Sequence, residues 1–424
     1  MCGIGGAWGS GAGGLVKKLA PWLLHRGQEG VGYAYYLGGE LKIGAPPDEA
    51  EGALVHTRYS TTGPYGEQTQ PILARYKDLE IAVVFNGTVV NYRRLGVPSP
   101  KFDGEALAKR LVYEIWERGV EDGVTEVYRE IVGAASLIAL TPWGILAVRD
   151  PRGVRPLAYS QEGDLLTLAS EDSVLGRGAE VPPGLAILYG RRMAIWKVPP
   201  GELKICALEF VYFSSHATTL SGRLVYDVRT RLGAALAELE TEEIDVVTYI
   251  PETARVAALA YAERINRPLV EAVLKNRYAG RVFIAPPTVR SPGDVFKIVS
   301  PLVKNKRVAV VDDSLIRGTN ISTVVKMLRE AGASAVHIRI ASPPVKWPCF
   351  FGLDFQTRRE LAAYGRDEEE VRESIGATTL RYLPLDIFKK ILGPDVCYGC
   401  FTGEYPQPVD VAQAEKELTR ATTL

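Results

Sequence analysis

The chain has no charge imbalance and no long apolar run, and these two absences argue against several classes of protein. Its 50 basic and 50 acidic side chains give a formal net charge of zero. That balance argues against a general nucleic-acid or membrane-surface binder, although a local basic pocket is compatible with it. No apolar stretch reaches the roughly 18 residues of a membrane span, and no basic-then-apolar leader opens the chain. We expect a cytoplasmic protein with neither a membrane nor a nucleic acid as partner.

Side-chain amides and methionine are scarce as well. The 424 residues include 6 asparagines, 7 glutamines and 3 methionines. Heat-adapted proteins avoid such thermolabile side chains, so the composition favours a thermophilic source. Hydrophobic residues make up 46% of the chain, which is enough for sizeable cores, and the length predicts two or three globular domains.

Only five cysteines are present, and in a reducing cytoplasm we do not expect them to form disulfides. Cys2 stands apart at the start, which leaves four. Cys397 and Cys400 form a Cys-x₂-Cys pair, whereas Cys206 and Cys349 are isolated. Such a pair fits zinc, redox or iron–sulfur chemistry, and four thiolates complete a zinc or iron–sulfur site. Four buried thiols without a metal are the alternative.

Cys2 is the most informative residue that is present. Removal of Met1 would make it the new N-terminus, ahead of the small residue Gly3. A free α-amine has a pKa near ~8 and a thiol one near ~8.5, so the neutral amine can take the proton of its own side chain. The sequence therefore predicts a nucleophile that carries its general base. The alternative is a disordered chain end in which Cys2 has no role.

The first part of the chain, up to about residue 200, is rich in short β-type runs broken by glycine and proline. Two helical stretches, near 14–25 and 104–118, interrupt these runs. Many strands with few helices predict a layered α+β sandwich.

The second part alternates strands with helices. Helical patterns near 252–264 and 320–331 follow buried-type strands, which predicts parallel βαβ units. The segment Val198–Gly201 has the composition of a linker. We therefore expect domains at 2–200, with Met1 removed, and at 201–424.

One of these strands, 308–311, ends in two acidic residues, Asp312 and Asp313, and a short loop that opens a helix. Backbone N–H groups and hydroxyls at a helix start suit a phosphate, and ligands of open α/β sheets lie beyond the carboxyl ends of the strands. The paired acids can bind ribose hydroxyls or hold Mg²⁺. The alternative is an ordinary capped helix after an acidic turn.

Motifs in both halves resemble known families. Cys2-Gly3-Ile4, His25–Glu29, His56–Thr61 and Asn86–Thr88 resemble a class II glutaminase of the N-terminal-nucleophile family, which implies an αββα sandwich. Val308–Asn320 resembles the phosphoribosyl-pyrophosphate (PRPP) loop of type I phosphoribosyltransferases, which implies an α/β domain with a parallel sheet.

In this order, the two halves resemble the glutamine PRPP amidotransferases over nearly the whole chain. The resemblance implies that ammonia released from glutamine is transferred to PRPP, giving 5-phosphoribosylamine and pyrophosphate in the first step of purine synthesis. It also implies Mg²⁺, inhibitory purine nucleotides and a homo-oligomer, either a dimer or a tetramer. The alternatives are a class II amidotransferase with another acceptor, a non-catalytic PRPP-sensing regulator, and a variant that also uses free ammonia.

The resemblance implies roles for single residues of the first half. The nucleophile and its oxyanion donors are Cys2, Asn86 and Gly87; the glutamine-binding group is Arg58 and Asp103, with Arg26 beside them in a structural or gating role. Tyr59 would couple the two sites. From the residues alone, Arg58 could equally form a surface ion pair and Asn86-Gly87 a β-turn.

The resemblance implies the following roles in the second half. PRPP would be bound by Asp312, Asp313, Ser314, Arg317, Gly318 and Thr319, with Lys275, Arg277 and Arg281 closing over pyrophosphate. Mg²⁺ would be held by Ser300, Asp312 and Asp313. A [4Fe–4S] cluster would be held by Cys206, Cys349, Cys397 and Cys400, the ligand positions of the iron–sulfur subclass. A solvated basic face is the alternative for the three pyrophosphate-binding cations.

Overall fold

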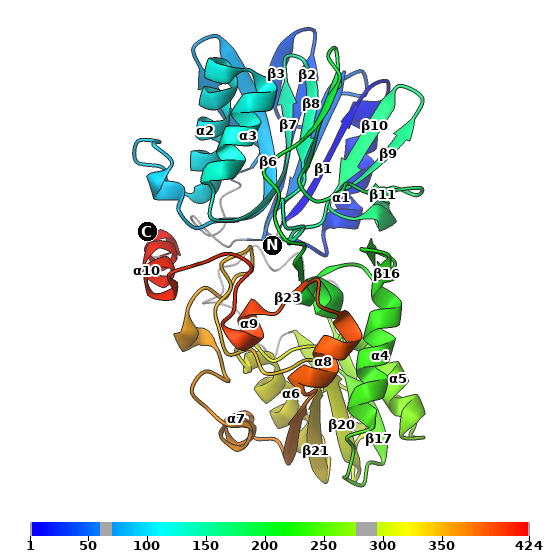
Figure 1. Ribbon diagram of the computed structural model, residues 1–424. Helices are drawn as coiled ribbons and strands as arrows, with labels where there is room; N and C mark the ends of the chain where they lie inside the picture. Colours follow the sequence, from blue (N-terminus) through cyan, green and yellow to red (C-terminus); the bar gives the residue numbers. More distant parts are fainter. Residues whose placement is uncertain (1, 60–69, 277–294, 423–424) are drawn as a thin grey trace.

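The computed structural model describes residues 2–59, 70–276 and 295–422, and its two halves lie end to end (Figure 1). The upper half in that view is a stack of two antiparallel sheets with helices outside, and the lower half is a parallel sheet with helices on both faces. No helix among the described residues is long and apolar enough to cross a membrane.

The first sheet carries Cys2 next to its central strand. Its strands, in spatial order, are β11 (Ala179–Glu180), β9 (Ala158–Glu162), β10 (Leu165–Ala169), β1 (Gly3–Trp8), β4 (Gly52–Thr57), β2 (Val31–Leu37) and β3 (Glu40–Ile43). Helix α1 (Ala12–Leu23) packs its apolar face on β1 and β4.

The second sheet stacks on the first through an apolar core that includes Ile4, Leu54 and Val84. Its strands, in spatial order, are β13 (Ala194–Lys197), β12 (Leu185–Gly190), β8 (Gly144–Val148), β7 (Gly133–Thr141), β6 (Leu79–Val89) and β5 (Ile72–Tyr76). Helices α2 (Asp103–Arg118) and α3 (Val120–Glu130) cover its outer face. The predicted αββα sandwich is confirmed.

Helix α3 is one element that the sequence pattern did not predict. Gly119, with φ +82°, ends α2 and begins α3, and Gly123 lowers the helix propensity of the second segment. A side chain at Gly123 would meet the Glu114 backbone at 2.5 Å. The glycine therefore lets two helices pack closely, and tertiary packing overrides its weak propensity.

The second half contains the predicted parallel sheet. Its strands, in spatial order, are β17 (Val246–Tyr249), β20 (Arg307–Asp312), β21 (Ala335–Ile340) and β22 (Thr379–Tyr382). Val308 and Val310 pack toward α6 (Thr319–Glu330) and α7 (Glu368–Ile375). Ala309 and Val311 pack toward α4 (Val225–Ala237) and α5 (Arg255–Arg264). Because both faces are covered, β20 is apolar without interruption over residues 308–311.

The remaining elements connect these layers. They are β14 (Ile205–Cys206), β15 (Thr219–Leu220), β16 (Arg223–Leu224), β18 (Val273–Lys275), β19 (Phe296–Ile298), α8 (Leu385–Leu392), β23 (Val396–Cys397), α9 (Gly399–Thr402) and α10 (Val411–Thr422). Helix α10 touches both halves. Glu417 pairs with Arg94 of the first half at 2.7 Å, and Glu415 with Arg358 of the second at 2.8 Å.

Candidate active site

Cys2 lies at the start of β1, half-buried, where the first sheet faces the second half. Its backbone N–H donates to Asn86 Oδ1 at 3.3 Å, and its thiol donates to the backbone oxygen of Tyr59 at 3.5 Å. Burial raises the pKa of the Cys2 thiol, and the hydrogen bond to Tyr59 and the charge of Arg58 oppose part of that shift. The thiol therefore needs a base to become a nucleophile.

Asn86, which contacts the Cys2 backbone, and Gly87 lie inside strand β6, opposite Ser136 and Ala135 of β7. The alternative of a β-turn is therefore wrong. Gly87 has φ +151°, and a side chain there would meet Ala134 O at 1.9 Å. Asn86 Nδ2 is buried and has no hydrogen-bond partner among the described residues. A buried donor without a partner is costly, and it marks a place where a ligand oxygen would be bound.

Arg58 and Asp103 place opposite charges near the thiol, because both act on the pKa of Cys2. Arg58 follows β4 and is 2% exposed, so the alternative of a surface ion pair is wrong. Asp103, 1% exposed, begins α2 and accepts hydrogen bonds from the N–H groups of Val89 and Gly104. A zwitterion such as an amino acid requires this kind of charge pair for its ammonium and carboxylate groups.

Arg26 faces the backbone of Cys2. Its Nε donates to Cys2 O at 3.3 Å. Its two terminal nitrogens donate to Glu171 Oε1 at 2.5 Å and to Glu209 Oε1 at 2.8 Å. Arg26 therefore contacts the backbone of Cys2 and not its thiol. The structural or gating role of Arg26 stays a prediction.

Asp312, the last residue of β20, and Asp313 directly after it form a buried pair. Burial and the charge of Asp313 raise the pKa of Asp312, and burial raises that of Asp313. Thr253 and Ser314 donate their hydroxyls to Asp313, and the charge of Lys275 acts on Asp312. Two buried carboxylates with little compensating charge are a donor set that fits a divalent cation.

The helix after this pair begins without a side-chain cap. Gly318 occupies the N-cap position of α6 with φ +79° and, as a glycine, supplies no side-chain cap to the first N–H groups of the helix. The alternative of an ordinary side-chain-capped helix is therefore wrong. Thr319 and Asn320 are exposed beside these donors. A helix start of this kind offers backbone donors and a positive dipole end to an anion.

One residue that the sequence analysis missed joins the two sites. Tyr59 Oη and Arg317 Nη1 both donate to Asp354 Oδ2, each at 3.2 Å. Burial, together with the charge of Asp354, raises the pKa of Tyr59. Asp354 belongs to no motif that carries the resemblance, so no sequence signal pointed to it.

A cavity of about 330 Å³ lies where the two halves meet. It is lined by side chains from both, including His25, Tyr59, Lys275, Phe296 and Asn320. Lys275 ends β18 at this cavity, whereas Ser300 is exposed at the start of a short 3₁₀ turn. The hydrogen bonds of the described residues do not join Ser300 to the two aspartates. Arg277 and Arg281 lie outside the described residues.

The other four cysteines gather on the second half. Parallel pairing of β14 with β23 sets Cys206 opposite Cys397. Burial raises the pKa of Cys400, and the charges of Cys349, Cys206 and Cys397 raise it further, so the four thiols lie within electrostatic range of one another. Among the described residues, no group of three or more histidine, cysteine, aspartate or glutamate side chains has the geometry of a metal site.

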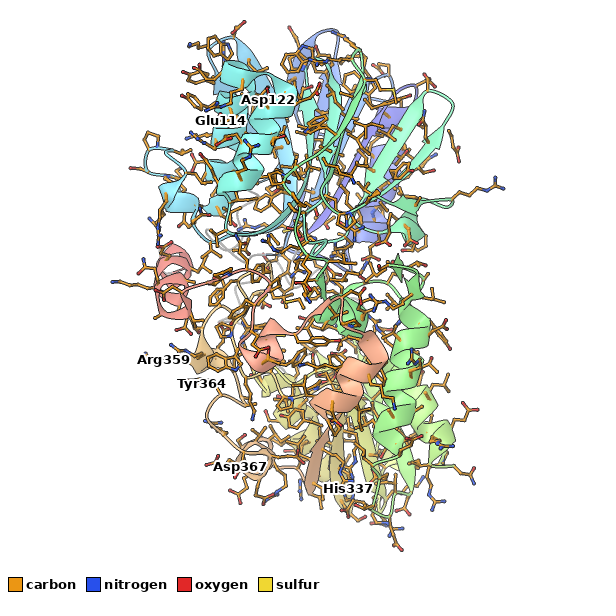
Figure 2. All side chains as sticks on the ribbon, in the orientation of Figure 1. Glu114, Asp122, His337, Arg359, Tyr364 and Asp367 are labelled. Atoms are coloured by element: carbon orange, nitrogen blue, oxygen red, sulfur yellow. The ribbon has the colours of Figure 1, made fainter. Side chains whose placement is uncertain are left out.

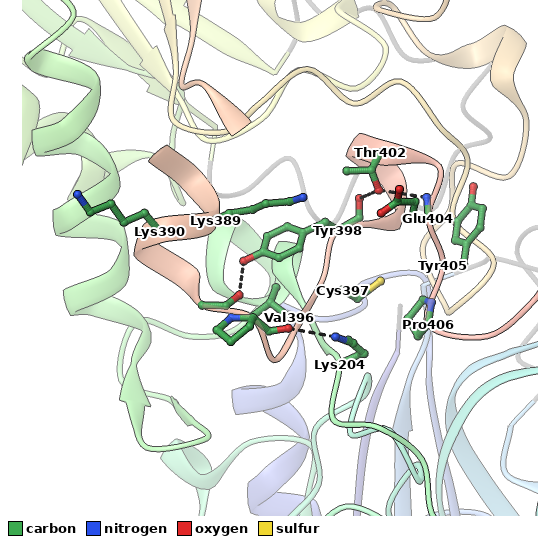
Figure 3. A pocket seen from close by; sticks show the side chains of 12 residues that line it. Lys204, Lys389, Lys390, Val396, Cys397, Tyr398, Thr402, Glu404, Tyr405 and Pro406 are labelled. Carbon is green, nitrogen blue, oxygen red and sulfur yellow. Dashed lines mark hydrogen bonds between the residues drawn. The ribbon is translucent and has the colours of Figure 1, made fainter. Parts of the chain in front are cut away.

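The surroundings of these thiols bear on what they can hold. The charges of Cys206 and Cys349 raise the pKa of the buried Arg155. A positive charge therefore lies near two sulfurs that would be negative as thiolates. Cys397 lies at a cavity of about 590 Å³ that Tyr398, Tyr405 and Lys204 help to line (Figure 3). By residue type, four cysteines beside a buried positive charge are the donors that a four-thiolate metal centre uses, but their arrangement here does not form metal-binding geometry.

Comparison with known proteins gives concordant matches for the whole chain. Residues 1–187 match the family described as "Glutamine amidotransferase domain". An amidophosphoribosyltransferase of Pyrococcus horikoshii is 35% identical, with 96% of each chain covered. The Bacillus subtilis glutamine PRPP amidotransferase, solved with ADP and GMP, is 32% identical at a TM-score of 0.84, covering 96% of this chain and 98% of its own. A structure titled as the allosteric regulatory enzyme of purine biosynthesis is also 32% identical, at 0.86, covering 98% and 99%.

Proposed function

We infer the mechanism of this protein from one premise: the chain belongs to the amidophosphoribosyltransferase family. It is a glutamine-dependent enzyme that transfers ammonia from glutamine to PRPP, giving glutamate, 5-phosphoribosylamine and pyrophosphate, the first step of purine biosynthesis. Relatives that match nearly the full length of the chain exclude two of the three alternatives, a PRPP-sensing regulator and an amidotransferase with another acceptor.

For the first half we propose thioester chemistry at Cys2. The α-amine freed by loss of Met1 takes the thiol proton, and the thiolate sulfur attacks the carboxamide carbon of glutamine. Asn86 Nδ2 and the Gly87 N–H stabilise the oxyanion, and the proton passes from the amine to the leaving ammonia. Water then hydrolyses the thioester and releases glutamate. This assignment is carried by Asn86 Nδ2, which has no partner among the described residues although its amide contacts the Cys2 backbone N–H.

Arg58 binds the α-carboxylate of glutamine and Asp103 binds its α-ammonium in this proposal. Both side chains are buried and both act on the pKa of Cys2, so the substrate's charged end is held close to the reacting bond. Fixed charges in a dry pocket orient the carboxamide toward the sulfur.

In the second half, ammonia attacks C1 of the ribose while pyrophosphate leaves. The start of α6, with Ser314, Arg317, Gly318 and Thr319, binds the 5′-phosphate, and Asp312 and Asp313 bind ribose hydroxyls. Mg²⁺ held through Asp312, Asp313 and Ser300 would neutralise charge on the leaving pyrophosphate, over which Lys275, Arg277 and Arg281 close. The uncapped helix and the buried acidic pair support these roles.

Tyr59 couples the two sites through Asp354. The 5′-phosphate of PRPP competes with Asp354 for Arg317, which changes the partner of the Tyr59 hydroxyl and, through the backbone of Tyr59, the contact with the Cys2 thiol. Ammonia passes through the cavity shared by both halves. A path that excludes water prevents its loss as ammonium.

The four remaining cysteines hold a [4Fe–4S] cluster in this proposal, with four-thiolate zinc as the chemical alternative. The centre is structural, because its ligands come from β14, the segment at Cys349 and the C-terminal tail. We further propose a domain boundary at residue 200 and a cytoplasmic homo-oligomer from a heat-adapted source. Inhibition by purine nucleotides is also part of the proposal, and the ADP and GMP in the Bacillus subtilis complex support it.

Replacement of the nucleophile tests this assignment. Cys2→Ala should lose glutamate release from glutamine while it retains pyrophosphate release from PRPP with ammonium salts at high pH. Glutamate release by Cys2→Ala at the wild-type rate would contradict the assigned nucleophile, and loss of both reactions in a folded variant would contradict the division into two sites.

A further inference from the structure

Four buried charged side chains form a continuous chain behind the nucleophile. Arg26, Arg155, Glu171 and Glu209 are all 0–1% exposed. Arg26 donates to Glu171 at 2.5 Å and to both oxygens of Glu209 at 3.1 and 2.8 Å. Arg155 Nη1 donates to Glu209 Oε1 at 3.2 Å. The first three residues belong to the first half and Glu209 to the second, so the chain of charges crosses the boundary between them.

The two ends of this charged chain lie at two different sites. At one end, Arg26 Nε donates to the backbone oxygen of Cys2 at 3.3 Å. At the other, Arg155 Nε donates to Phe351 O at 2.6 Å, two residues beyond Cys349, and its charge acts on Cys206 and Cys349. Glu209 sits between them, three residues after Cys206. The nucleophile and the four-cysteine site are thereby joined by ion pairs.

The charged chain is built to be rigid. Two arginines and two glutamates balance, and hydroxyls complete the carboxylates: Ser214 donates to Glu209 at 2.7 Å and Thr218 to Glu171 at 2.6 Å. Removal of one partner from a buried pair leaves an uncompensated charge, so the remaining groups must rearrange. A substitution at Glu209 would therefore displace the Arg26 side chain and, with it, the Cys2 backbone oxygen to which Arg26 donates.

We propose that Glu209 is a positioning residue for the glutaminase reaction. It fixes the position of the Arg26 guanidinium, which in turn fixes the Cys2 backbone carbonyl. The Cys2 sulfur is thereby oriented toward the glutamine carboxamide, which is bound near Asn86. Arg155 extends the same set of ion pairs to the four-cysteine site, so the architecture of that site sets the position of the nucleophile. This inference rests on the proposed role of Cys2.

Reactivity of Cys2 and steady-state kinetics of Glu209→Gln test the inference in the full-length enzyme. Alkylation of Cys2 by iodoacetamide, read by mass spectrometry of the N-terminal peptide, should slow at least fivefold. The kcat for glutamate release should fall at least tenfold with the KM for glutamine within threefold. Ammonia-dependent pyrophosphate release and the metal content per chain should stay within twofold of wild type.

Glu240→Gln is the matched control, because Glu240 forms another buried ion pair, with Arg339 at 2.6 Å. Arg339 lies on the same strand as His337, which Figure 2 shows at the far end of the second half from the boundary. This control should leave the alkylation rate and kcat within twofold of wild type. Equal losses in Glu240→Gln and Glu209→Gln would mean a general loss of stability and would overturn the inference.

An alkylation rate and a kcat in Glu209→Gln equal to those of wild type would also overturn the inference about Glu209. The proposed function would still stand in that case, provided that Cys2→Ala has no glutaminase activity. If Glu209→Gln does not fold, Arg26→Lys tests the inference through the same alkylation rate and kcat. Lysine keeps the positive charge but lacks the several guanidinium N–H donors that bind Glu209 and Cys2 O. Retention of glutaminase activity by Cys2→Ala would remove the premise of both proposals.

Discussion

At the scale of single residues, one buried donor next to Cys2 carries the most information, because it has no partner among the residues that the structure describes. Asn86 Nδ2 is buried, and the Oδ1 of the same amide accepts from the Cys2 backbone N–H. The next residue in the strand is a glycine that cannot be replaced without a collision. Folded proteins rarely leave such a donor unpaired. We therefore expect this donor to find its partner in the complex with substrate, where the negative oxygen forms.

Asn86→Ala is expected to lower the kcat for glutamate release by about 10²–10³-fold, the range found when one oxyanion donor is removed. The KM for glutamine should change little, because Arg58 and Asp103 remain. Steady-state kinetics with PRPP present measure both constants, and ammonia-dependent synthesis serves as the internal control. A kcat within threefold of wild type would mean that Asn86 does not bind the oxyanion.

Glu171 gives a prediction for stability against pH. Arg26 and His25 keep the pKa of this buried carboxyl well below its usual range despite its desolvation. In the unfolded chain the group titrates near ~4.3, so the unfolded state takes up the proton first as the pH falls. The stabilisation is complete above that pH and is lost progressively below it.

Thermal unfolding of wild type and Glu171→Gln between pH 7 and pH 3 measures this effect. The variant should unfold at a lower temperature at pH 7, and the difference in midpoint should shrink as the pH falls below about 4.3. A difference that stays constant over this range would show that the charge of Glu171 contributes nothing to stability.

At the scale of elements, the sequence pattern predicted what local chemistry determines. The strand 308–311, the helix near 320–331 and the acidic pair between them were all predicted, because apolar runs and phosphate-loop residues are local signals. Helix α3 was missed, because glycines at 119 and 123 hide an amphipathic segment that tertiary packing stabilises. Asn86-Gly87 alone could equally have been a turn; its pairing partner in β7, about fifty residues further along the chain, decides otherwise.

The N-terminus of α6 yields a prediction at the same scale. Gly318→Ala puts a side chain on a residue with φ +79°, which L-residues other than glycine adopt at a cost of about 1 kcal/mol or more. The first turn of the helix should therefore shift, and the KM for PRPP should rise about tenfold or more while glutamine binding to Cys2 is kept. Saturation curves for PRPP with ammonia as donor measure this, and an unchanged KM would argue against phosphate binding at this helix.

At the scale of the whole molecule, the residues that join the halves could not be predicted from the sequence. Asp354, Glu171 and Arg155 belong to no local motif. Glu209 lies in the segment after Cys206, which gives no hint of its ion pairs. The partners of all four residues lie far away in the chain. Their roles arise only when the sandwich and the parallel sheet are brought together. The resemblance could identify what each half does, whereas the contacts between them needed the structure.

The contacts of Asp354 predict how the halves communicate. Asp354→Asn removes the charge shared by the Tyr59 hydroxyl and Arg317. Glutaminase activity without PRPP and ammonia-dependent synthesis should each remain within about threefold of wild type, whereas the stimulation of glutamate release by PRPP should fall at least fivefold. Unchanged stimulation would rule out this route between the sites.

The most direct measurement of the central claim, that one chain holds two coupled sites, is glutamate and pyrophosphate release in the same sample of wild-type enzyme, with and without PRPP. The account predicts slow glutamate release without PRPP, at least a tenfold rise when PRPP is added, and equal amounts of the two products. A rate of glutamate release that does not change when PRPP is added, or an amount of glutamate well above that of pyrophosphate, would contradict the two-site account.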